Sequence, residues 1–574
     1  MSLIPPGEKI IETKKCQISG KEFFVTNKDL EFYDTVSPVF AWKKYLIPSP
    51  TLSPDERQKR RLSWRNEQKL YRRKCDKSGR EIVSLYAPEK ELIVYDQKAW
   101  WGDDWSPRDY WMEFDFTRNF FEQFWDLMKC VPLPATLGRN LENSDYSLHS
   151  ADLKNCYLIV STIGGEELLY GYQGNGSKNC VDFYQSNNSE YCYQIVDVHR
   201  SYKCYFSQDL DDCQGCLFCY DCKNCNNCLF CFNLRGKSYC VNNIQLSPEE
   251  YEKEKEKISL QNHLKLLQKR FQQMLLQVAH RATHGIKNEN CIGDYLNSCS
   301  NCFECFNYAE WEELRYISTW RWAKNSYDSN YTTGEWTLEC LSPFPANRVA
   351  FSAYPWWSVE SYYLYYCQSC TQCFWSISLK QEKYCILNKP YSVAEYEQLC
   401  WKIIDHMRST GEWWEFFPHE LSPFGYNETV AQEYFPLTES EVKNHGWNWY
   451  DEPLKTFEGA SLTPLPISEY DEKKVGYDTA QKNIDTLLAG IVQCEVTGKP
   501  FKIIRQELAF YIEHSLPIPT KHPDQRHKER MDLRNPRTLY ERTCGECGTD
   551  MITTYSPQRP ERVVCEECYR KLVY

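Results

Sequence analysis

Small and apolar residues recur at an interval of twelve positions through the middle of the chain. The series extends back through Leu168 to Cys156, and the sixth place of each of its eight frames is polar. Short apolar stretches closed by a turn-forming polar residue suit the strand and corner of a small β-solenoid coil. We therefore predict a β-solenoid over residues 141–246. Its clearest frames begin at Cys180, Cys192, Cys204, Cys216, Cys228 and Cys240.

A fainter array of eight frames follows over residues 288–391, with one residue deleted between its fourth and fifth frames. Its end repeats the end of the first array at an offset of 145 residues, so that Cys240 matches Cys385 and Glu250 matches Glu395. The pattern predicts a second β-solenoid, with neighbouring coils stacked about 4.8 Å apart. The frames begin at Cys302, Leu314, Ser326, Leu338, Val349, Ser361, Cys373 and Cys385.

Between Cys213 and Cys231 a cysteine stands at every third position. The same columns of other frames hold Ile195, Leu210 and Ser207, so small and apolar residues alternate with cysteine there. A narrow interior that admits only small side chains explains this pattern and is the preferred interpretation. The alternative is a thiolate cluster that binds zinc or iron and sulfur.

Each array is followed by a predicted helix. Ser247-Pro-Glu-Glu and Ser392-Val-Ala-Glu are capping signals, and the helices that they open should stop near Gly285 and Gly411. The first helix, over residues 247–287, is expected to join or cap the arrays, and the second covers residues 392–411.

Two further segments separate the repeats from the ends. A helical linker is expected at 111–140, before the first array. Residues 412–480 are rich in proline, glutamate and aromatic residues without a sustained period, which indicates an irregular connector. It should be packed, because clustered aromatic side chains tend to be buried. These are Trp413, Trp414, Phe416 and Phe417.

The two ends of the chain are copies of one module. Residues 1–110 and 481–574 share eleven identical residues at an offset of 469, from Asp55 and Asp524 to Gly79 and Gly548. Taken together, the patterns predict a mainly β, multi-domain α+β chain. Two short-coil β-solenoids would be flanked by duplicated zinc-ribbon-like terminal modules.

The C-terminal module carries a four-cysteine metal pattern. Two Cys-x-x-Cys pairs supply four thiolates, which close a tetrahedron around one structural zinc ion and leave no position open for catalysis. The predicted ligands are Cys544, Cys547, Cys565 and Cys568. In the N-terminal copy only Cys75 remains, because Ser78, Asp96 and Ala99 replace the other three.

The upstream half of the C-terminal module reads Cys494-x-x-Thr497-Gly-Lys-Pro-Phe501, then Glu507-Leu-x-Phe510-Tyr511, then His522-Pro-Asp-Gln-Arg526. It resembles short bacterial zinc-ribbon (treble-clef) domains, and the resemblance implies a second four-ligand site. Thr497 and Gln525 replace two of its cysteines and His522 a third, so Cys494 and His522 form at most a weak second site. In the N-terminal copy Cys16 is the one cysteine at the four equivalent ligand places.

Over nearly its full length the chain is also similar to a group of uncharacterised cysteine-rich proteins from candidate-phyla bacteria. The similarity lies in the Pro-Asp-x-Arg helix, the Asn-Cys frames and Ser422-Pro-Phe-Gly-Tyr-Asn. It implies no activity.

A basic helix is repeated in both modules. Its arginines stand at i, i+4 and i+8, on one helix face. Such a row suits phosphate oxygens, which predicts a rigid two-ended reader of RNA, DNA or ribonucleoprotein. The equally weighted alternative is that these arginines pair with acidic groups of the same protein. The residues are Arg57, Arg61, Arg65 and Arg73, mirrored by Arg526, Arg530, Arg534 and Arg542.

Composition narrows the remaining choices. The 574 residues carry a net charge of −12 and a mean hydropathy of −0.64, and no long apolar run or secretory signal is visible. We therefore expect no membrane association and a cytoplasmic location, where thirty cysteines would be metal ligands or buried thiols. A second function hypothesis is a protein-interaction scaffold using the solenoid surface, and a third is a metal-cluster or redox protein.

No phosphate loop, His-Glu-x-x-His or nucleophile motif is present, so no enzyme is predicted. His280 and His284 could be a metal pair, although capping of the preceding helix is preferred. The polar sixth place of the frames in the first array could bind calcium, but a role in forming the turns is the preferred interpretation. This column of polar places includes Asp197, Asp209 and Asp221.

Overall fold

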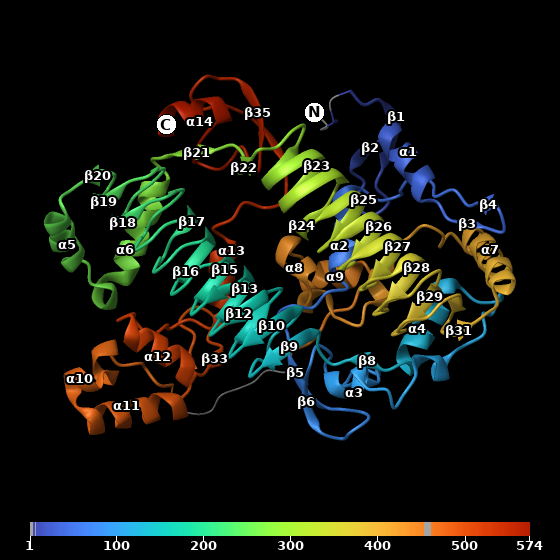
Figure 1. Ribbon diagram of the computed structural model, residues 1–574, viewed down its shortest axis with the longest axis horizontal. Coiled ribbons are helices and arrows are strands. Elements are labelled where there is room, and N and C mark those ends of the chain that lie inside the picture. Colours follow the sequence, from blue (N-terminus) through green and yellow to red (C-terminus); the bar gives the residue numbers. More distant parts are fainter. Residues whose placement is uncertain (1–3, 6, 453–460) are drawn as a thin grey trace.

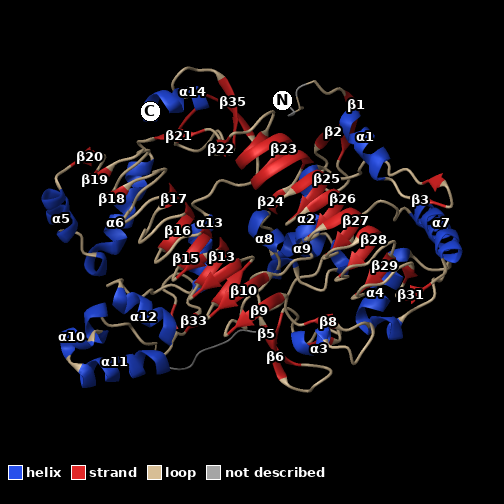
Figure 2. Cartoon of the chain, in the orientation of Figure 1, coloured by secondary structure: helices blue, strands red, loops and turns tan. Residues whose placement is uncertain are grey.

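The computed structural model describes residues 4–5, 7–452 and 461–574. It has mixed helix and strand content, with two rows of short strands side by side and the helices around them (Figures 1 and 2). No helix in the described part of the chain is long and apolar enough to cross a membrane.

The first array is a stack of coils joined by parallel strand pairing. Val181 pairs with Tyr193 and Val196 with Gln208, so each residue lies beside the one twelve positions later. Its strands are β9 (Gly138–Glu142), β10 (Ser150–Lys154), β11 (Tyr157–Val160), β12 (Ile163–Glu166), β13 (Leu169–Asn175), β14 (Ser177–Lys178), β15 (Val181–Asn187), β16 (Tyr193–His199), β17 (Gln208–Asp211), β18 (Asn226–Leu229), β19 (Ser238–Val241) and β20 (Ile244–Gln245).

A shorter period lies inside each coil of the first array. From Asp152 to Asn242 every third residue has a positive φ, between 44° and 68°. The backbone therefore turns four corners in twelve residues, and one residue between successive corners points inward. This explains the cysteines at every third position: Cys213 to Cys231 are all inward-facing and at most 2% exposed.

Of the seven thiols from Cys213 to Cys231, all but that of Cys225 donate a hydrogen bond to a carbonyl of the next coil. The Sγ of Cys213 lies 3.2 Å from the carbonyl oxygen of Cys222, and that of Cys231 lies 3.4 Å from the carbonyl oxygen of Cys240. Cysteine is small enough for this interior and can still satisfy a backbone acceptor.

The second array has the same construction with an irregular coil. Leu314 pairs with Ser326 at a spacing of twelve, but Tyr327 pairs with Leu338 at eleven. At Gly334, φ is 151° and a Cβ atom would lie 2.3 Å from the carbonyl oxygen of Ala346, so only glycine fits.

The register of the second array differs from the predicted one by a residue. Thr337 pairs with Val349 at the full spacing of twelve. The fourth frame therefore begins at Thr337 rather than Leu338, and the deleted residue lies in the preceding coil. The strands are β22 (Gly285–Ile286), β23 (Ile292–Arg315), β24 (Ser318–Arg321), β25 (Ala323–Asn330), β26 (Gly334–Leu341), β27 (Ala346–Ala353), β28 (Val359–Tyr365), β29 (Phe374–Ile377), β30 (Cys385–Ile386) and β31 (Lys389–Pro390).

Both predicted capping boxes are present after the arrays, at Ser247 and Ser392. Helix α7 (Val393–Thr410) ends at Gly411 as predicted. The first helix was expected to reach Gly285, which is wrong. It is divided into α5 (Pro248–Glu256) and α6 (Leu260–Leu275), and β21 (Ala279–Arg281) follows.

The terminal modules contain matching elements. The N-terminal copy has β1 (Ile10–Lys15), β2 (Glu22–Thr26), α1 (Asn27–Val36), β3 (Val39–Phe40), β4 (Lys43–Lys44), α2 (Pro54–Leu62), β5 (Tyr71–Lys74), β6 (Glu81–Ser84), β7 (Val94–Tyr95) and α3 (Gln97–Trp101). The C-terminal copy has β32 (Val492–Gln493), β33 (Pro500–Phe501), α12 (Arg505–Glu513), α13 (Pro523–Met531), β34 (Tyr540–Thr543), β35 (Asp550–Thr553), β36 (Arg562–Val564) and α14 (Glu566–Val573).

The remaining elements connect these parts. They are α4 (Phe120–Cys130) and β8 (Leu133–Pro134) before the first array, then α8 (Val430–Tyr434), α9 (Glu439–Asn444), α10 (Glu472–Val475) and α11 (Tyr477–Ala489) after the second. Short 3-10 helices occur at Pro107–Tyr110, His419–Leu421, Tyr426–Glu428 and Ile467–Tyr470.

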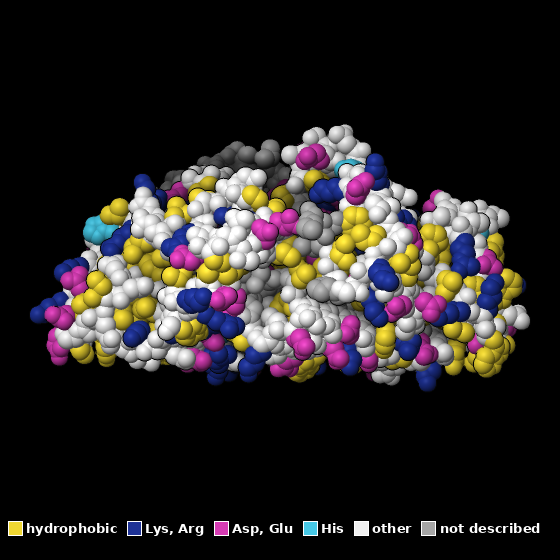
Figure 3. Space-filling view, turned by 90° about the horizontal axis from the view of Figure 1, so that it is seen from above, with side chains coloured by type: hydrophobic (Ala, Val, Ile, Leu, Met, Phe, Trp, Pro, Cys, Tyr) yellow, Lys and Arg dark blue, Asp and Glu magenta, His cyan; other side chains and the backbone are white. Residues whose placement is uncertain are grey.

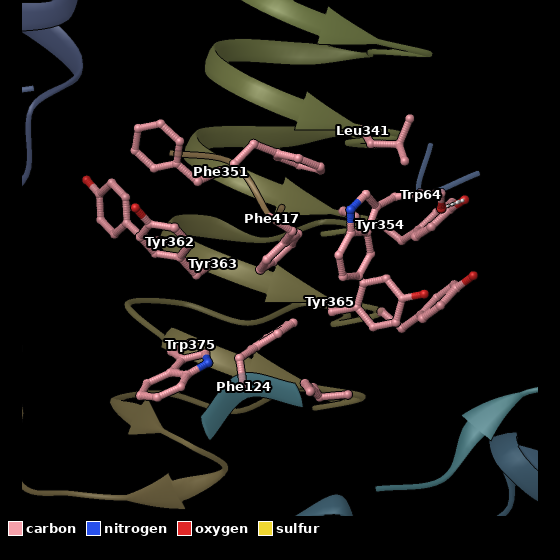
Figure 4. Packing of buried hydrophobic residues seen from close by; sticks show 14 of the residues in the cluster. Trp64, Phe124, Leu341, Phe351, Tyr354, Tyr362, Tyr363, Tyr365, Trp375 and Phe417 are labelled. Atoms are coloured by element: carbon pink, nitrogen blue, oxygen red, sulfur yellow. Dashed lines mark hydrogen bonds between the residues drawn. The ribbon is translucent and has the colours of Figure 1, made fainter. Parts of the chain in front are cut away.

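An aromatic core joins the connector to the outer wall of the second array. Figure 4 shows Phe124 of α4 and Phe417 of the connector lying against this wall, with ring centroids 4.6 Å apart. Trp64 packs edge-on against Tyr365 of β28. The expected burial of the connector aromatics is confirmed for Trp413, Phe416 and Phe417, which are fully buried.

Candidate metal centre and arginine clamps

The arginines of α2 lie inside the molecule, against the second array. The guanidinium of Arg57 lies 2.8 Å from the carboxylate of Asp328, and that of Arg61 lies 2.7 Å from Glu339. Arg57 is 3% exposed and Arg61 is fully buried. The helix is therefore docked to the array by ion pairs that water does not reach.

The C-terminal copy repeats this arrangement against the first array. Arg526 and Arg530 of α13 both contact Asp182, with 2.9 Å between Arg530 and its carboxylate. Arg530 also approaches Gln194. Asp182 and Gln194 occupy the places in the first array that Asp328 and Glu339 occupy in the second. The array ends match at an offset of 145 residues. Residues before the short coil, such as Asp182 and Asp328, match at an offset that is one residue larger.

The third arginine of each row lies three residues after the end of its helix and contacts both arrays. Arg65 donates hydrogen bonds to Ser161 of the first array and to Ser342 of the second, at 2.8 and 2.6 Å. Its copy Arg534 contacts Asn307 at 2.6 Å and Asp197 at 2.8 Å. By the same offset Asn307 is equivalent to Ser161, and Ser342 to Asp197.

These paired contacts relate the halves of the molecule reciprocally. The N-terminal helix α2 docks on the second array and the C-terminal helix α13 on the first. The rest of each module, from β5 or β34 onwards, contacts the other array or the residues just before it. Leu85, after β6, hydrogen-bonds to Ala135 just before the first array, and Thr554, after β35, hydrogen-bonds to Asp294 at the start of the second (Figure 1). We call the buried contacts of Arg57, Arg61 and Arg65, and those of Arg526, Arg530 and Arg534, the two arginine clamps.

The prediction that these arginines meet phosphate gains no support at the six row positions, because their side chains are buried and contact the arrays, which favours the alternative of internal pairing. Arg73 and Arg542 are also engaged, with the carbonyl groups of Leu92 and of Ser556 and Glu561. On the face seen in Figure 3, Lys and Arg side chains are interspersed with Asp and Glu.

The four predicted zinc ligands lie together. One ligand atom from each of Cys544, Cys547, Cys565 and Cys568 lies within 4.8 Å of the others, which is a group that could hold a metal ion. Hairpin β34–β35 supplies the first two cysteines, with Gly548 at φ 74° closing the turn. The third is the N-cap of α14, and the fourth lies in its first turn.

Backbone N–H groups surround the buried sulfur of this group. Burial alone raises the pKa of the Cys544 thiol, but N–H groups of Cys547, Cys565 and Glu546 stabilise the thiolate and bring the pKa down to about 6. Four thiols this close together fit a four-coordinate metal ion and would complete its coordination, so a bound ion would hold structure.

Hydrogen bonds occupy the same place in the N-terminal copy. The N–H groups of Ser78 and Asp96 point to the sulfur of Cys75, at 3.4 and 3.3 Å. Asp96 also caps α3 by accepting from the N–H of Ala99 at 2.9 Å. Cys75 is the one cysteine left at the four metal-ligand places, so hydrogen bonds and packing stabilise this part of the N-terminal module.

The weak second site at Cys494 and His522 gains no support. The ring of His522 caps α13 by accepting from the N–H of Asp524 at 3.1 Å. Among the described residues, the four-cysteine group is the one set of three or more histidine, cysteine, aspartate or glutamate side chains close enough to share a metal. The buried thiols of the arrays thus fall outside any such set.

The acidic column of the first array and the two histidines are also engaged. Asp197 pairs with Arg534, Asp209 accepts from Tyr295 at 2.9 Å, and Asp221 pairs with Arg235 at 2.9 Å. His280 contacts the carbonyl oxygen of Leu275, the last residue of α6, which agrees with the predicted capping. His284 contacts Asp294 at 3.2 Å.

Comparison with known proteins adds no further assignment. No family model matches the chain, and no curated protein matches it. The acidic partners of the clamps were missed from sequence, although one signal pointed to them. Asp182 and Asp328 occupy equivalent places in the two arrays, as Arg526 and Arg57 do in the two modules.

Proposed function

We propose that the protein is a zinc-containing, non-enzymatic binding protein. Its two β-solenoids would be held as one rigid body by duplicated zinc-ribbon-like modules. The observation that carries this proposal is the reciprocal docking of α2 and α13, whose buried arginines join each module to the array at the other end of the chain. Four converging thiolates support a structural rather than a catalytic metal.

Within this proposal we favour binding of a protein or a small ligand over nucleic acid. Nucleic-acid affinity comes chiefly from accessible cationic groups that neutralise phosphates. The arginines whose spacing suits phosphate binding form ion pairs with carboxylates of the same chain. The net charge of −12 opposes a polyanion further.

Purification of the untagged protein under anaerobic conditions tests the proposal. We expect one zinc ion per chain, no iron, and an absorbance ratio at 260 and 280 nm typical of protein alone. Co-purifying nucleic acid that resists high salt would contradict the preference against nucleic acid. Absence of zinc, or several metal ions per chain, would contradict the proposed architecture of the C-terminal module.

A further inference from the structure

A cavity of about 480 Å³ lies where the two ends of the chain meet the first array. Its apolar wall comes from the outer face of the first array and includes Leu158, Val160 and Tyr172. Lys69, from the N-terminal module, lines it together with Lys499 and the first turn of α13 in the C-terminal module. With the connector residues Asn427 to Pro436, four parts of the chain that are far apart in sequence build one site, of a size that suits a small organic ligand.

An equivalent cavity of about 420 Å³ lies at the second array. Lys21, Pro54 and Asp55 line it at the places that Lys499, Pro523 and Asp524 hold in the first cavity. Its ribbon segment, Leu539 to Glu541, is the copy of the segment that begins at Leu70. The reciprocal docking of the modules therefore creates the same kind of cavity twice.

The two cavities differ in their walls. Leu158 of the first cavity is replaced by Glu304 in the second, while the neighbouring tyrosines Tyr170 and Tyr316 are retained. Glu22 and Glu541 add further carboxylates to the second cavity. Only the first cavity therefore combines an apolar wall with two converging lysines.

The lysines of the first cavity already hold one carboxylate. The Nζ atoms of Lys69 and Lys499 lie 3.4 and 3.6 Å from the same oxygen of Glu452. The Glu452 side chain is 50% exposed, so this contact is only weakly stabilising and can exchange with another anion. The carboxylate of Glu452 marks the position that an anionic group would take.

His527 supplies a second polar group at the cavity wall. It is 7% exposed, its ring stacks on Tyr172 with centroids 3.9 Å apart, and its Nε2 lies 3.1 Å from Glu433. Its Nδ1 has no hydrogen-bond partner among the described residues. That nitrogen has almost no accessible surface, so His527 helps to build the cavity wall and does not offer a binding atom to a ligand.

We propose that this cavity binds a small anion with a flat apolar body, which rests on the proposed function as a binding protein. The carboxylate or phosphate of the ligand displaces Glu452 between Lys69 and Lys499. The apolar body lies against Leu158, Val160 and Tyr172. The second cavity, which has Glu304 in place of Leu158 and Lys21 as the one lysine among its described lining residues, does not take the same ligand.

Calorimetric titration with 2-naphthoate and with 2-naphthyl phosphate tests the proposal and separates the two anionic groups. We expect one site per chain for at least one probe. Replacing Lys69 and Lys499 together by alanine should weaken binding about tenfold or more, since two charge-assisted contacts are lost. E452Q should strengthen binding because it removes the competing carboxylate.

K21A is the matched control, because Lys21 is the equivalent lysine of the second cavity. It should leave binding unchanged. Failure of both probes to bind a folded chain that contains one zinc ion would overturn the cavity proposal alone. Equal loss in K21A and in the double variant would also overturn it. A chain that lacks zinc would instead count against the proposed function.

Discussion

Arg57 and Asp328 form a two-contact ion pair between the N-terminal module and the second array. Their charged atoms lie 2.8 and 2.9 Å apart in the two contacts, and their side chains are 4% and 1% exposed. Burying both charges is costly, and the pair offsets that cost only while both partners are present. Arg526 and Asp182 repeat the relationship in the other half of the molecule.

Removing one partner of this pair should destabilise the protein strongly. We expect R57A to lower the free energy of unfolding by about 3–5 kcal/mol, because the buried carboxylate of Asp328 loses its two-contact partner and keeps only a longer contact of 3.4 Å with Arg61. Chemical denaturation measures the change. R72A is the control, since Arg72 is exposed on β5 and should cost about 0.5 kcal/mol or less. Equal effects of the two variants would show that the Arg57 charge is not buried in solution.

Metal removal should loosen the C-terminal ribbon and a segment far from it in sequence. β36 pairs with β21, so residues 279–281 depend on the ribbon that carries the four cysteines. In C568S, or after chelation, we expect loss of one zinc ion and faster amide exchange at residues 540–574 and 279–281. The hairpin β5–β6, which has no complete cysteine group, is the internal control. Unchanged exchange at 279–281 would argue against this coupling.

The periodic parts of the fold could be predicted from the sequence because most coils obey the same steric rule, and the prediction missed the register only at the short coil of the second array. The spacing of twelve located both arrays, and Cys-x-x-Cys spacing located the metal group. The corner at every third residue was not foreseen. Corner positions such as Tyr170, Phe206 and Phe218 adopt positive φ without the glycine or asparagine that usually signals it.

The groups that pair with the arginines could not be predicted from the local sequence pattern. A row of arginines on one helix face looks alike whether it meets phosphate or a buried carboxylate. Arg57 and Asp328 are 271 residues apart, and only the docking of the module brings them together. The alternative of internal pairing was open at the level of sequence, and the burial of both partners decides it.

Stability should fall as the pH rises towards 9. Burial lowers the pKa of His284, but the nearby carboxylates of Asp294 and Asp209 outweigh it and raise the pKa to about 9. The unfolded value is about 6.5, so the folded state holds the extra proton between these values. The contribution is therefore complete below about pH 6.5 and is lost as the pH passes through 9.

Thermal unfolding between pH 6 and 9.5 checks this prediction, with H284N as the comparison. The melting temperature of the native chain should drop more steeply above pH 7 than that of the variant. Parallel curves would mean that His284 is not protonated in the folded protein.

The thiols should divide sharply by reactivity. Cys130 is exposed and Cys291 is partly exposed, whereas the cysteines from Cys213 to Cys231 are buried in the array. Alkylation of the native, zinc-loaded protein should label Cys130 and Cys291 and leave Cys213 to Cys231 unlabelled. All thirty cysteines should react after unfolding. Mass spectrometry of peptides gives the answer. Labelling of Cys219 before unfolding would contradict a closed interior.

A double-mutant cycle on Arg57 and Asp328 tests the central claim most directly. The free energies of unfolding of R57M, D328L and the double variant give the coupling between the two side chains. We predict a coupling of about 2 kcal/mol or more, with the double variant more stable than either single one, because neither Arg57 nor Asp328 is then buried without the other. A coupling near zero would contradict the arginine clamps and return these arginines to the surface.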